Sequence, residues 1–211
     1  MKLYYAPGAC SLAPHIILRE SGLEFELEKV DLGTKTTASG EDFLEISKLG
    51  YVPALLLDSG QVLTEASVTL QYIADQSPGA GLIPAPGSFA RYRLQEHLNF
   101  VSAEIHKTLG AFFNPAMTPQ WRESQLAIFD KRAQHLDAHF SSNTFLMGDG
   151  FSVADAYLFT VLGWTGLHNI DMSPYPNLCS YIERVQSRPA VVEAMVAEGL
   201  LPASQEYQKA S

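Results

Sequence analysis

Cysteine is scarce in this chain, and its scarcity removes several classes of protein. The 211 residues contain two cysteines, Cys10 and Cys179, too far apart in sequence to suggest the disulfide framework of a small secreted domain. The position three residues after Cys10 is Ala13, so the second thiol of a C-x-x-C redox motif is missing. Any redox chemistry at Cys10 therefore needs a sulfur atom from another molecule.

Positive charge and long apolar segments are also in short supply. Lysine and arginine number 14 against 23 acidic residues, a net charge of −9 that argues against sequence-independent binding of nucleic acid. No apolar run approaches the roughly 20 residues of a membrane-spanning helix, and none at the N-terminus resembles a signal peptide. We expect a cytoplasmic protein that binds neither nucleic acid nor membranes; export by a route without a signal peptide stays open.

Metal-binding and phosphate-binding motifs are missing as well. His135 and His139 are one helical turn apart, but neither a third ligand nor an HExxH glutamate accompanies them. The glycines at 79 and 81 lie in an irregular stretch and do not open a helix after a strand, as those of a phosphate-binding loop do. We therefore expect no metal ion and no nucleotide phosphate site.

The N-terminal residues predict a strand, a turn and the start of a helix, with Cys10 at the junction. Residues 3–5 are strand formers, the pair at 7–8 is proline-glycine, and Ser11 is a suitable helix cap. The positive end of the helix dipole would favour the thiolate of Cys10 and lower its pKa. Cys10 is thus a candidate reactive group, and the alternative is a small apolar residue packed under a loop.

Residues 1–77 predict one α/β domain with the element order βαβ-α-ββα. After the first strand and helix, we expect elements at 24–28 (strand), 41–49 (helix), 55–57 and 61–63 (a hairpin) and 64–76 (helix). The first two strands flank a helix and should be parallel. Pro53 stands at the start of the hairpin, and general frequencies favour a trans Val52–Pro53 bond over a cis one.

A proline- and glycine-rich linker at residues 78–88 precedes a second domain, residues 89–211, in which helical patterns predominate. Apolar periodicity predicts two long antiparallel helices over 88–113 and 119–140, packed as part of an all-α bundle. Ser152 and Asp155 have capping-box spacing ahead of a strongly apolar helix, which favours a structural role for both.

Polar and aromatic residues of the second domain allow two interpretations. One face of the first long helix carries polar positions at spacings of three, four and seven: Asn99, Ser102 or Ala103, and His106. They are equally compatible with ligand contacts and with a solvated stripe. The aromatic residues could wall an apolar cavity between the domains or belong to the core: Phe112, Phe113, Tyr157 and Trp164.

The motifs of both domains occur in a specific order that spans essentially the whole chain: Tyr5, Pro7-Gly8-Ala9-Cys10-Ser11, Val52-Pro53-Ala54-Leu55, Thr64-Glu65, Asn99, His106-Lys107 and Phe151-Ser152-Val153-Ala154-Asp155-Ala156-Tyr157. In this order and spacing they resemble a cytosolic glutathione transferase of the bacterial beta class. The resemblance implies a thioredoxin-like N-terminal domain, an all-helical C-terminal domain and a homodimer. It also implies glutathione as co-substrate, small apolar electrophiles as its reaction partners, and a cis Val52–Pro53 bond.

The resemblance assigns residues to each part of the site. Those at the reacting sulfur are Cys10, His106 and Tyr5. Those that bind glutathione are Lys35, Val52, Pro53, Glu65, Ala66, Ser67, Lys107 and, across the dimer, Asn99. Those of the electrophile site are Phe112, Phe113, Tyr157 and Trp164. Many relatives have serine at the position of Ala66 and a hydroxyl residue at that of Ala103, which implies weaker glutathione binding here.

Two alternatives accompany this assignment. Cys10 either assists a glutathione thiolate that attacks electrophiles, or forms a mixed disulfide with glutathione and supports thiol transfer or reductive chemistry. The chain could also be a non-catalytic protein that keeps the fold to bind apolar ligands or a partner. The joint presence of Cys10, Pro53, Glu65 and His106 argues against that second alternative.

Overall fold

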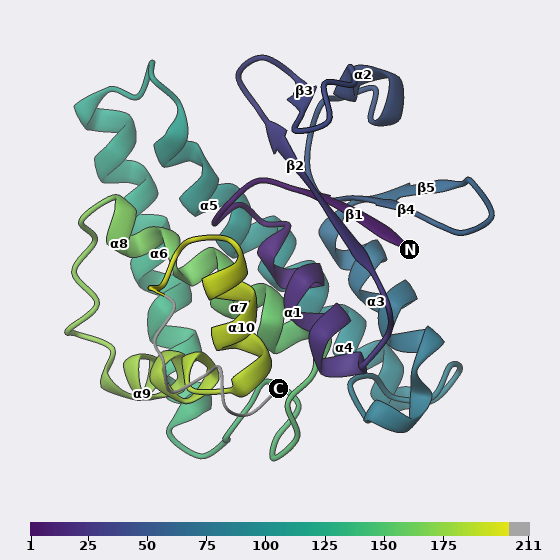
Figure 1. Cartoon of the computed structure of the whole chain (residues 1–211). Coiled ribbons are helices and arrows are strands. Elements are labelled where there is room, and N and C mark those ends of the chain that lie inside the picture. Colours follow the sequence, from purple (N-terminus) through teal and green to yellow (C-terminus); the bar gives the residue numbers. More distant parts are fainter. Residues whose placement is uncertain (203–211) are drawn as a thin grey trace.

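A computed structural model describes residues 1–202 of the chain (Figure 1). Its N-terminal part contains a five-stranded sheet in the order β3-β2-β1-β4-β5. The strands are β1 (Lys2–Tyr5), β2 (Glu26–Asp31), β3 (Thr36–Thr37), β4 (Ala54–Leu56) and β5 (Val62–Thr64). β1 and β2 are parallel and all other neighbours are antiparallel, which confirms the predicted βαβ unit and hairpin.

Alternation along β1 gives the sheet two covered faces, because successive side chains of a strand point to opposite sides. Leu3 and Tyr5 enter the main core with helices α1 (Leu12–Ser21) and α3 (Ala66–Gln76). Tyr4 packs on the other face against Phe43 of the short helix α2 (Phe43–Ile46), with ring centroids 5.8 Å apart. The domain therefore has the thioredoxin-like α/β architecture expected from the sequence.

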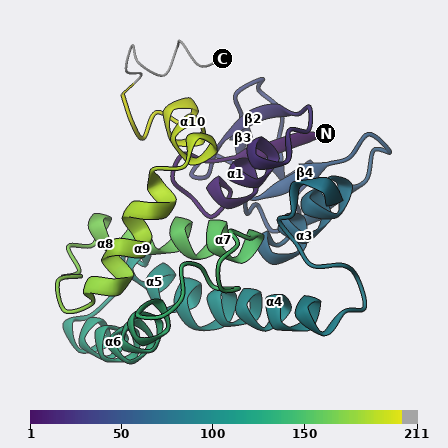
Figure 2. The same ribbon diagram turned by 90° about the horizontal axis from the view of Figure 1, so that it is seen from below.

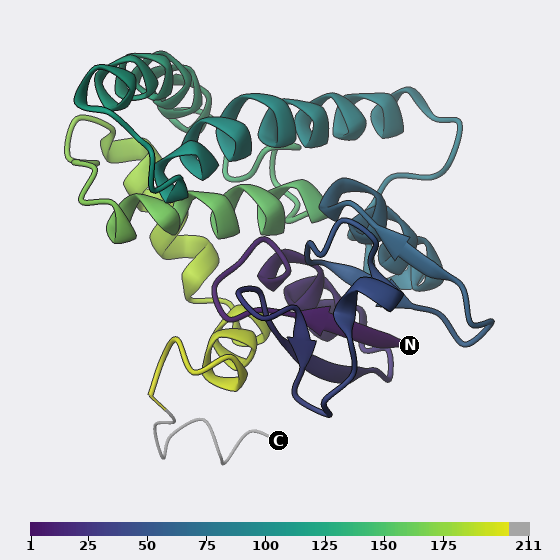
Figure 3. The same cartoon turned by 90° about the horizontal axis from the view of Figure 1, so that it is seen from above.

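The rest of the described chain is helical. Its helices are α4 (Phe89–Phe100), a π-helical turn η2 (Val101–His106), α5 (Lys107–Gly110), α6 (Pro119–Phe140), α7 (Val153–Leu162), α8 (Trp164–Leu167), α9 (Pro176–Gln186) and α10 (Pro189–Ala197), with 3-10 turns η1 (Pro78–Ala80) and η3 (Ala111–Phe113). All ten residues of α7 are buried, and α7 packs against α1, α3 and α4 (Figures 2 and 3). No helix within residues 1–202 is both long and apolar enough to cross a bilayer.

Capping groups start two helices at the predicted positions. At α6, the Thr118 hydroxyl accepts a hydrogen bond from the N–H of Trp121 at 3.2 Å. At α7, the Asp155 carboxylate accepts hydrogen bonds from the N–H and the hydroxyl of Ser152, at 2.9 and 2.7 Å. The capping box that the spacing predicts is therefore present, and it lies at the buried start of the central helix.

The structure differs from the sequence-based expectation in several places, and one of them is β2, which spans Glu26–Asp31 where a strand is expected at 24–28. β3 is an additional strand of two residues, and α2 is shorter than the helix predicted at 41–49. The helix expected over 88–113 is interrupted by η2, whose turns are wider than those of an α-helix. Ser11 precedes α1 but does not cap it: its backbone is already helical, and its hydroxyl bonds the N–H and carbonyl of Ala6.

Candidate functional site

A cleft of about 1060 Å³ lies between the sheet domain and the helical domain. Its walls come from the β1–α1 loop, the segment before β4, the start of α3, and helical residues of η2, α5, α7 and α8. Ten of the predicted site residues line it: Cys10, Val52, Pro53, Glu65, Ala66, His106, Lys107, Phe113, Tyr157 and Trp164. The fold thus gathers in one place residues that are widely separated along the chain.

The loop that carries Cys10 is attached to the C-terminal part of the chain at Gly8. Gly8 has a φ of 70°, a conformation that favours glycine. Its N–H donates to Glu198 Oε2 and its carbonyl accepts from the indole N–H of Trp164, both at 2.9 Å. Glu198 Oε1 also bonds Nδ1 of His15 at 2.9 Å, and both of these side chains are fully buried. This network sets the position of the Cys10 loop.

The Cys10 thiol is a hydrogen-bond donor in the structure. Its Sγ lies 3.1 Å from the carbonyl oxygen of Val52, an arrangement that requires a protonated sulfur. Burial raises the pKa of the Cys10 thiol to about 12, and the backbone N–H groups of Cys10 and Ser11 offset only part of that effect. The expected lowering of this pKa by the helix dipole is therefore wrong, because desolvation outweighs the dipole.

Slow alkylation of Cys10 at neutral pH should follow from this raised pKa. The thiolate is the nucleophile, and its fraction at neutral pH should be about a hundredfold or more below that of an ordinary cysteine of pKa ~8.5. Mass spectrometry after iodoacetamide treatment should show a Cys10 rate that still rises beyond about pH 9. In a Cys10→Ser variant, the remaining alkylation measures the contribution of Cys179. An alkylation rate of Cys10 that levels off near neutral pH would contradict the raised pKa of this thiol.

Two backbone features lie at the cleft. The Val52–Pro53 bond is cis, as the resemblance implies. Glu65 has φ 67° and ψ 119° directly before α3, an uncommon conformation for a residue other than glycine. The N–H groups of Ala66 and Ser67 belong to the first turn of α3 and have no partner within that helix, so they can bind a carboxylate. The Ser67 side chain is outside the cleft lining.

His106 ends the π-helical turn and is held by two aromatic residues. Its Nδ1 lies 2.6 Å from the hydroxyl of Tyr157 on α7, and the two rings are perpendicular with centroids 5.7 Å apart. The Trp164 ring makes a second edge contact at 4.9 Å. Burial, together with the charge of Lys107, lowers the pKa of His106 to about 4, so the imidazole is neutral at pH 7. It can donate one hydrogen bond but supplies no positive charge.

Positive charge at the cleft comes from two exposed lysines, Lys48 and Lys107. Lys35, the other predicted cation, is not part of the lining. Its Nζ donates to the carbonyl of Gly50 at 2.9 Å. Its Nζ also lies 5.8 Å from the ring centroid of Tyr51, which lines the cleft, so Lys35 is next to the lining at this point.

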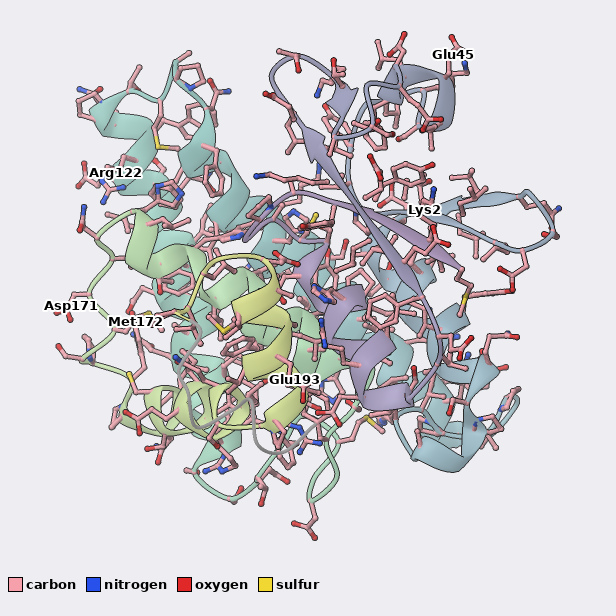
Figure 4. All side chains as sticks on the ribbon, in the orientation of Figure 1. Lys2, Glu45, Arg122, Asp171, Met172 and Glu193 are labelled. Atoms are coloured by element: carbon pink, nitrogen blue, oxygen red, sulfur yellow. The ribbon has the colours of Figure 1, made fainter. Side chains whose placement is uncertain are left out.

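Three other predicted site residues lie away from the cleft lining. Tyr5 is buried in the core, where its ring centroid is 6.1 Å from that of His15. Phe112 packs under the guanidinium of Arg122, a residue labelled on α6 in Figure 4. Asn99 lies on α4 in a separate pocket of about 430 Å³. Within one chain, these three residues therefore do not line the cleft to which Cys10 and His106 belong.

Ser102, one of the polar candidates on the helix face of His106, lines the cleft, whereas two further lining residues were not indicated by the sequence. Leu167 and Leu200 are large apolar lining residues, and 66% and 39% of their respective surfaces are exposed. Leu200 packs over Gly8, so its place depends on a contact between the two ends of the chain. No local sequence signal indicates either leucine.

Two family models match the sequence. Residues 8–76 match the N-terminal domain of glutathione S-transferase, and residues 100–189 match its C-terminal domain. The chain is also 40% identical over 200 residues to glutathione S-transferase GstA of Escherichia coli O157:H7. That alignment covers 95% of this chain and 100% of the relative.

Solved structures give the same result. A sphingomonad glutathione S-transferase complexed with glutathione is 47% identical, with a TM-score of 0.92 and coverage of 95% of this chain and 100% of that one. A bacterial beta class glutathione S-transferase from Sphingomonas chungbukensis is 46% identical, with the same TM-score and the same coverage. The chain therefore belongs to the glutathione S-transferase family and, within it, resembles the bacterial beta class.

Proposed function

We propose that this glutathione S-transferase binds glutathione in the cleft, stabilises its thiolate and transfers it to apolar electrophiles. The proposal depends mainly on one observation. The cis Val52–Pro53 bond, Glu65 with its positive φ and the His106 imidazole all line the same cleft. The Val52 backbone can pair with the cysteinyl part of glutathione. Glu65 and the N–H groups of residues 66–67 suit its γ-glutamyl end. Lys107 adds positive charge from the lining, and Lys35 adds charge from beside Tyr51, just outside the lining.

The proposed reaction needs an ionised sulfur and an apolar neighbour. Free glutathione has a thiol pKa of about 8.5–9, so only a few per cent is nucleophilic at neutral pH. A hydrogen bond from His106 would stabilise the anion after its proton has left to solvent. The thiolate then forms a bond to the electrophilic carbon, and the leaving group departs with the electron pair. The apolar wall for the electrophile contains Phe113, Trp164, Leu167 and Leu200.

The proposal divides the work between two domains. Residues 1–77 bind glutathione, residues 78–88 are the linker, and residues 89–211 line the electrophile site. Of this last range, residues 203–211 lie outside the described part of the chain. We place the working protein in the cytoplasm.

The proposed active form is a homodimer. Three aromatic side chains are unusually exposed in the single chain: Tyr51 (67%), Phe89 (72%) and Tyr92 (61%). Phe89 and Tyr92 share a pocket with Asn99 on α4. A second subunit packed on this face would bring Asn99 close to the partner's glutathione, the role implied by the resemblance.

Cys10 offers a second reaction with the same ligand. In thiol transfer, the Cys10 thiolate attacks the glutathione sulfur of a mixed disulfide and releases the other thiol. A second glutathione thiolate then attacks the Cys10 disulfide, which frees Cys10 and yields glutathione disulfide. The raised pKa of Cys10 limits the first step and favours conjugation as the main activity.

Both activities should be measured in the wild type and in Cys10→Ala. We expect conjugation of glutathione to an aryl halide to persist in the variant, and release of glutathione from a mixed disulfide to be lost. Loss of both would make Cys10 the activator of glutathione, and survival of both would remove Cys10 from the chemistry. A wild type that glutathione stabilises thermally, but that converts no aryl halide, epoxide, hydroperoxide or mixed disulfide, would support the non-catalytic alternative.

A further inference from the structure

We infer that Tyr157 is a positioning residue that selects the tautomer of His106 and thereby directs an N–H group at the glutathione sulfur. The inference rests on the proposed function, because it concerns how His106 acts in that reaction. It assigns Tyr157 a polar task in addition to its place in the apolar wall of the cleft.

The position of Tyr157 is strongly constrained. The residue is 2% exposed and belongs to α7, in which every residue is buried, so its ring cannot turn away without disturbing the core. Its hydroxyl lies 2.6 Å from Nδ1 of His106. The edge contacts of the His106 ring with Tyr157 and Trp164 limit rotation of the imidazole. One nitrogen of His106 is therefore committed to Tyr157.

The shared proton between the two side chains belongs to the phenol. Burial raises the pKa of Tyr157 and lowers that of His106 to about 4, so a protonated phenol faces a neutral imidazole at pH 7. Within residues 1–202 the only hydrogen-bond partner of the Tyr157 hydroxyl is Nδ1 of His106. The phenol proton is therefore available to His106 Nδ1. A neutral imidazole that accepts at Nδ1 carries its own proton on Nε2.

The second nitrogen of His106 is open to the cleft. Within residues 1–202 no hydrogen bond joins Nε2 to another group, and Nε2 is not one of the buried polar atoms that lack a partner. Cys10, His106 and Tyr157 all line this cleft. A glutathione sulfur bound among them would accept the Nε2–H. The thiol proton leaves to solvent, and the imidazole keeps its own.

Removal of the phenol hydroxyl should mix the tautomers of His106. In the second tautomer Nδ1 carries the proton, and Nε2 presents a lone pair to the cleft. A lone pair repels the thiolate, whereas an N–H stabilises it. The hydroxyl of Tyr157 therefore acts on the sulfur through His106, without contact with glutathione.

The test is the pKa of the bound glutathione thiol in Tyr157→Phe, which keeps the aromatic ring. Ultraviolet absorbance of the thiolate, followed against pH at saturating glutathione, should show this pKa raised by about one unit, or about tenfold less thiolate at neutral pH. The kcat with an aryl halide should fall by a similar factor, whereas the KM for glutathione changes by less than about threefold. Nitrogen-15 NMR should show Nε2–H in the wild type and mixed tautomers in the variant.

Two further variants separate positioning from loss of structure. Tyr181→Phe also removes a buried hydroxyl of the helical domain, one that donates to Asp155, and should leave the thiol pKa unchanged. His106→Gln offers an amide donor that has no tautomers. In that background Tyr157→Phe should therefore change the thiolate fraction by less than about twofold.

The results of these experiments distinguish a failure of the role of Tyr157 from a failure of the proposed glutathione transferase function. Three results would overturn the role of Tyr157: an unchanged thiol pKa in Tyr157→Phe, a wild-type imidazole protonated on Nδ1, or an equal effect of Tyr157→Phe with and without the His106→Gln change. The proposed function would stand as long as the wild type ionises bound glutathione and conjugates it. A wild type that does neither would overturn the proposed function itself.

Discussion

Replacement of Glu198 by alanine should lower the free energy of unfolding by about 3–5 kcal/mol and weaken glutathione binding. The carboxylate is fully buried and holds Gly8 N–H and His15 Nδ1, both at 2.9 Å. Its removal leaves buried polar groups without partners, which is costly in a protein interior. Because Gly8 belongs to the loop that carries Cys10, one wall of the cleft should also loosen. Urea denaturation and a glutathione titration measure the two effects.

Glu193→Ala is the matched control on α10, the helix that ends directly before Glu198. Glu193 lies on the surface of α10 (Figure 4), where it pairs with Arg19 at 3.1 Å and its side chain is 55% exposed. Exposed pairs of this kind contribute less than about 1 kcal/mol. Glu198→Gln, which keeps one acceptor oxygen, should lose less stability than Glu198→Ala. Equal unfolding free energies for Glu193→Ala and Glu198→Ala would contradict the role of the buried network.

Asp155→Ala should be nearly as destabilising, at about 3–5 kcal/mol, because one buried carboxylate satisfies several donors. It accepts hydrogen bonds from the N–H of Leu146, the N–H and hydroxyl of Ser152, and the hydroxyl of Tyr181. Its loss leaves these groups unpaired at the start of the central helix α7. Chemical denaturation of the wild type and the variant at several pH values measures the effect.

The difference in unfolding free energy between the wild type and Asp155→Ala should also depend on pH, and its direction follows from the pKa of Asp155. Burial raises the pKa of Asp155 to about 6. A raised carboxyl pKa contributes stability that is present below the unfolded value of ~3.9 and lost as pH rises through the folded value. The gap between wild type and Asp155→Ala should therefore widen from pH 7 to pH 5. Asp171→Ala, on the loop after α8 (Figure 4), is the exposed control, and a gap that narrows toward acid would refute the raised pKa.

Local signals explain which elements the sequence predicts well. The proline-glycine pair at 7–8 ends β1, the Asp58-Ser59-Gly60 turn separates β4 from β5, and Thr118 starts α6. Each is a short-range effect of backbone conformation or capping, so a few neighbouring residues determine it. By contrast, the two residues of β3 are too few for a recognisable alternation. The π-helical turn differs from an α-helix by a small change in winding that barely affects apolar spacing.

The site was harder to predict where its chemistry depends on distant contacts. The pKa of Cys10 is raised by burial at the cleft and, to a smaller extent, by the charge of Glu65, and a helix-dipole argument includes neither. Glu198 meets His15 across 183 positions of sequence. The resemblance supplied the residues of the cleft as a group, whereas the hydrogen bond between His106 and Tyr157 required the structure.

Calorimetric titration of glutathione into the wild type and Glu65→Gln tests the central claim most directly, because Glu65 is expected to hold the charged γ-glutamyl end in the cleft. We predict a wild-type Kd in the millimolar range or below, and binding about tenfold weaker for the variant, or ~1.4 kcal/mol. Glu193→Gln, on the exposed surface of α10 (Figure 4), should bind like the wild type. Absence of binding to the wild type, or equal affinities of the wild type and Glu65→Gln, would contradict the assignment of this cleft to glutathione.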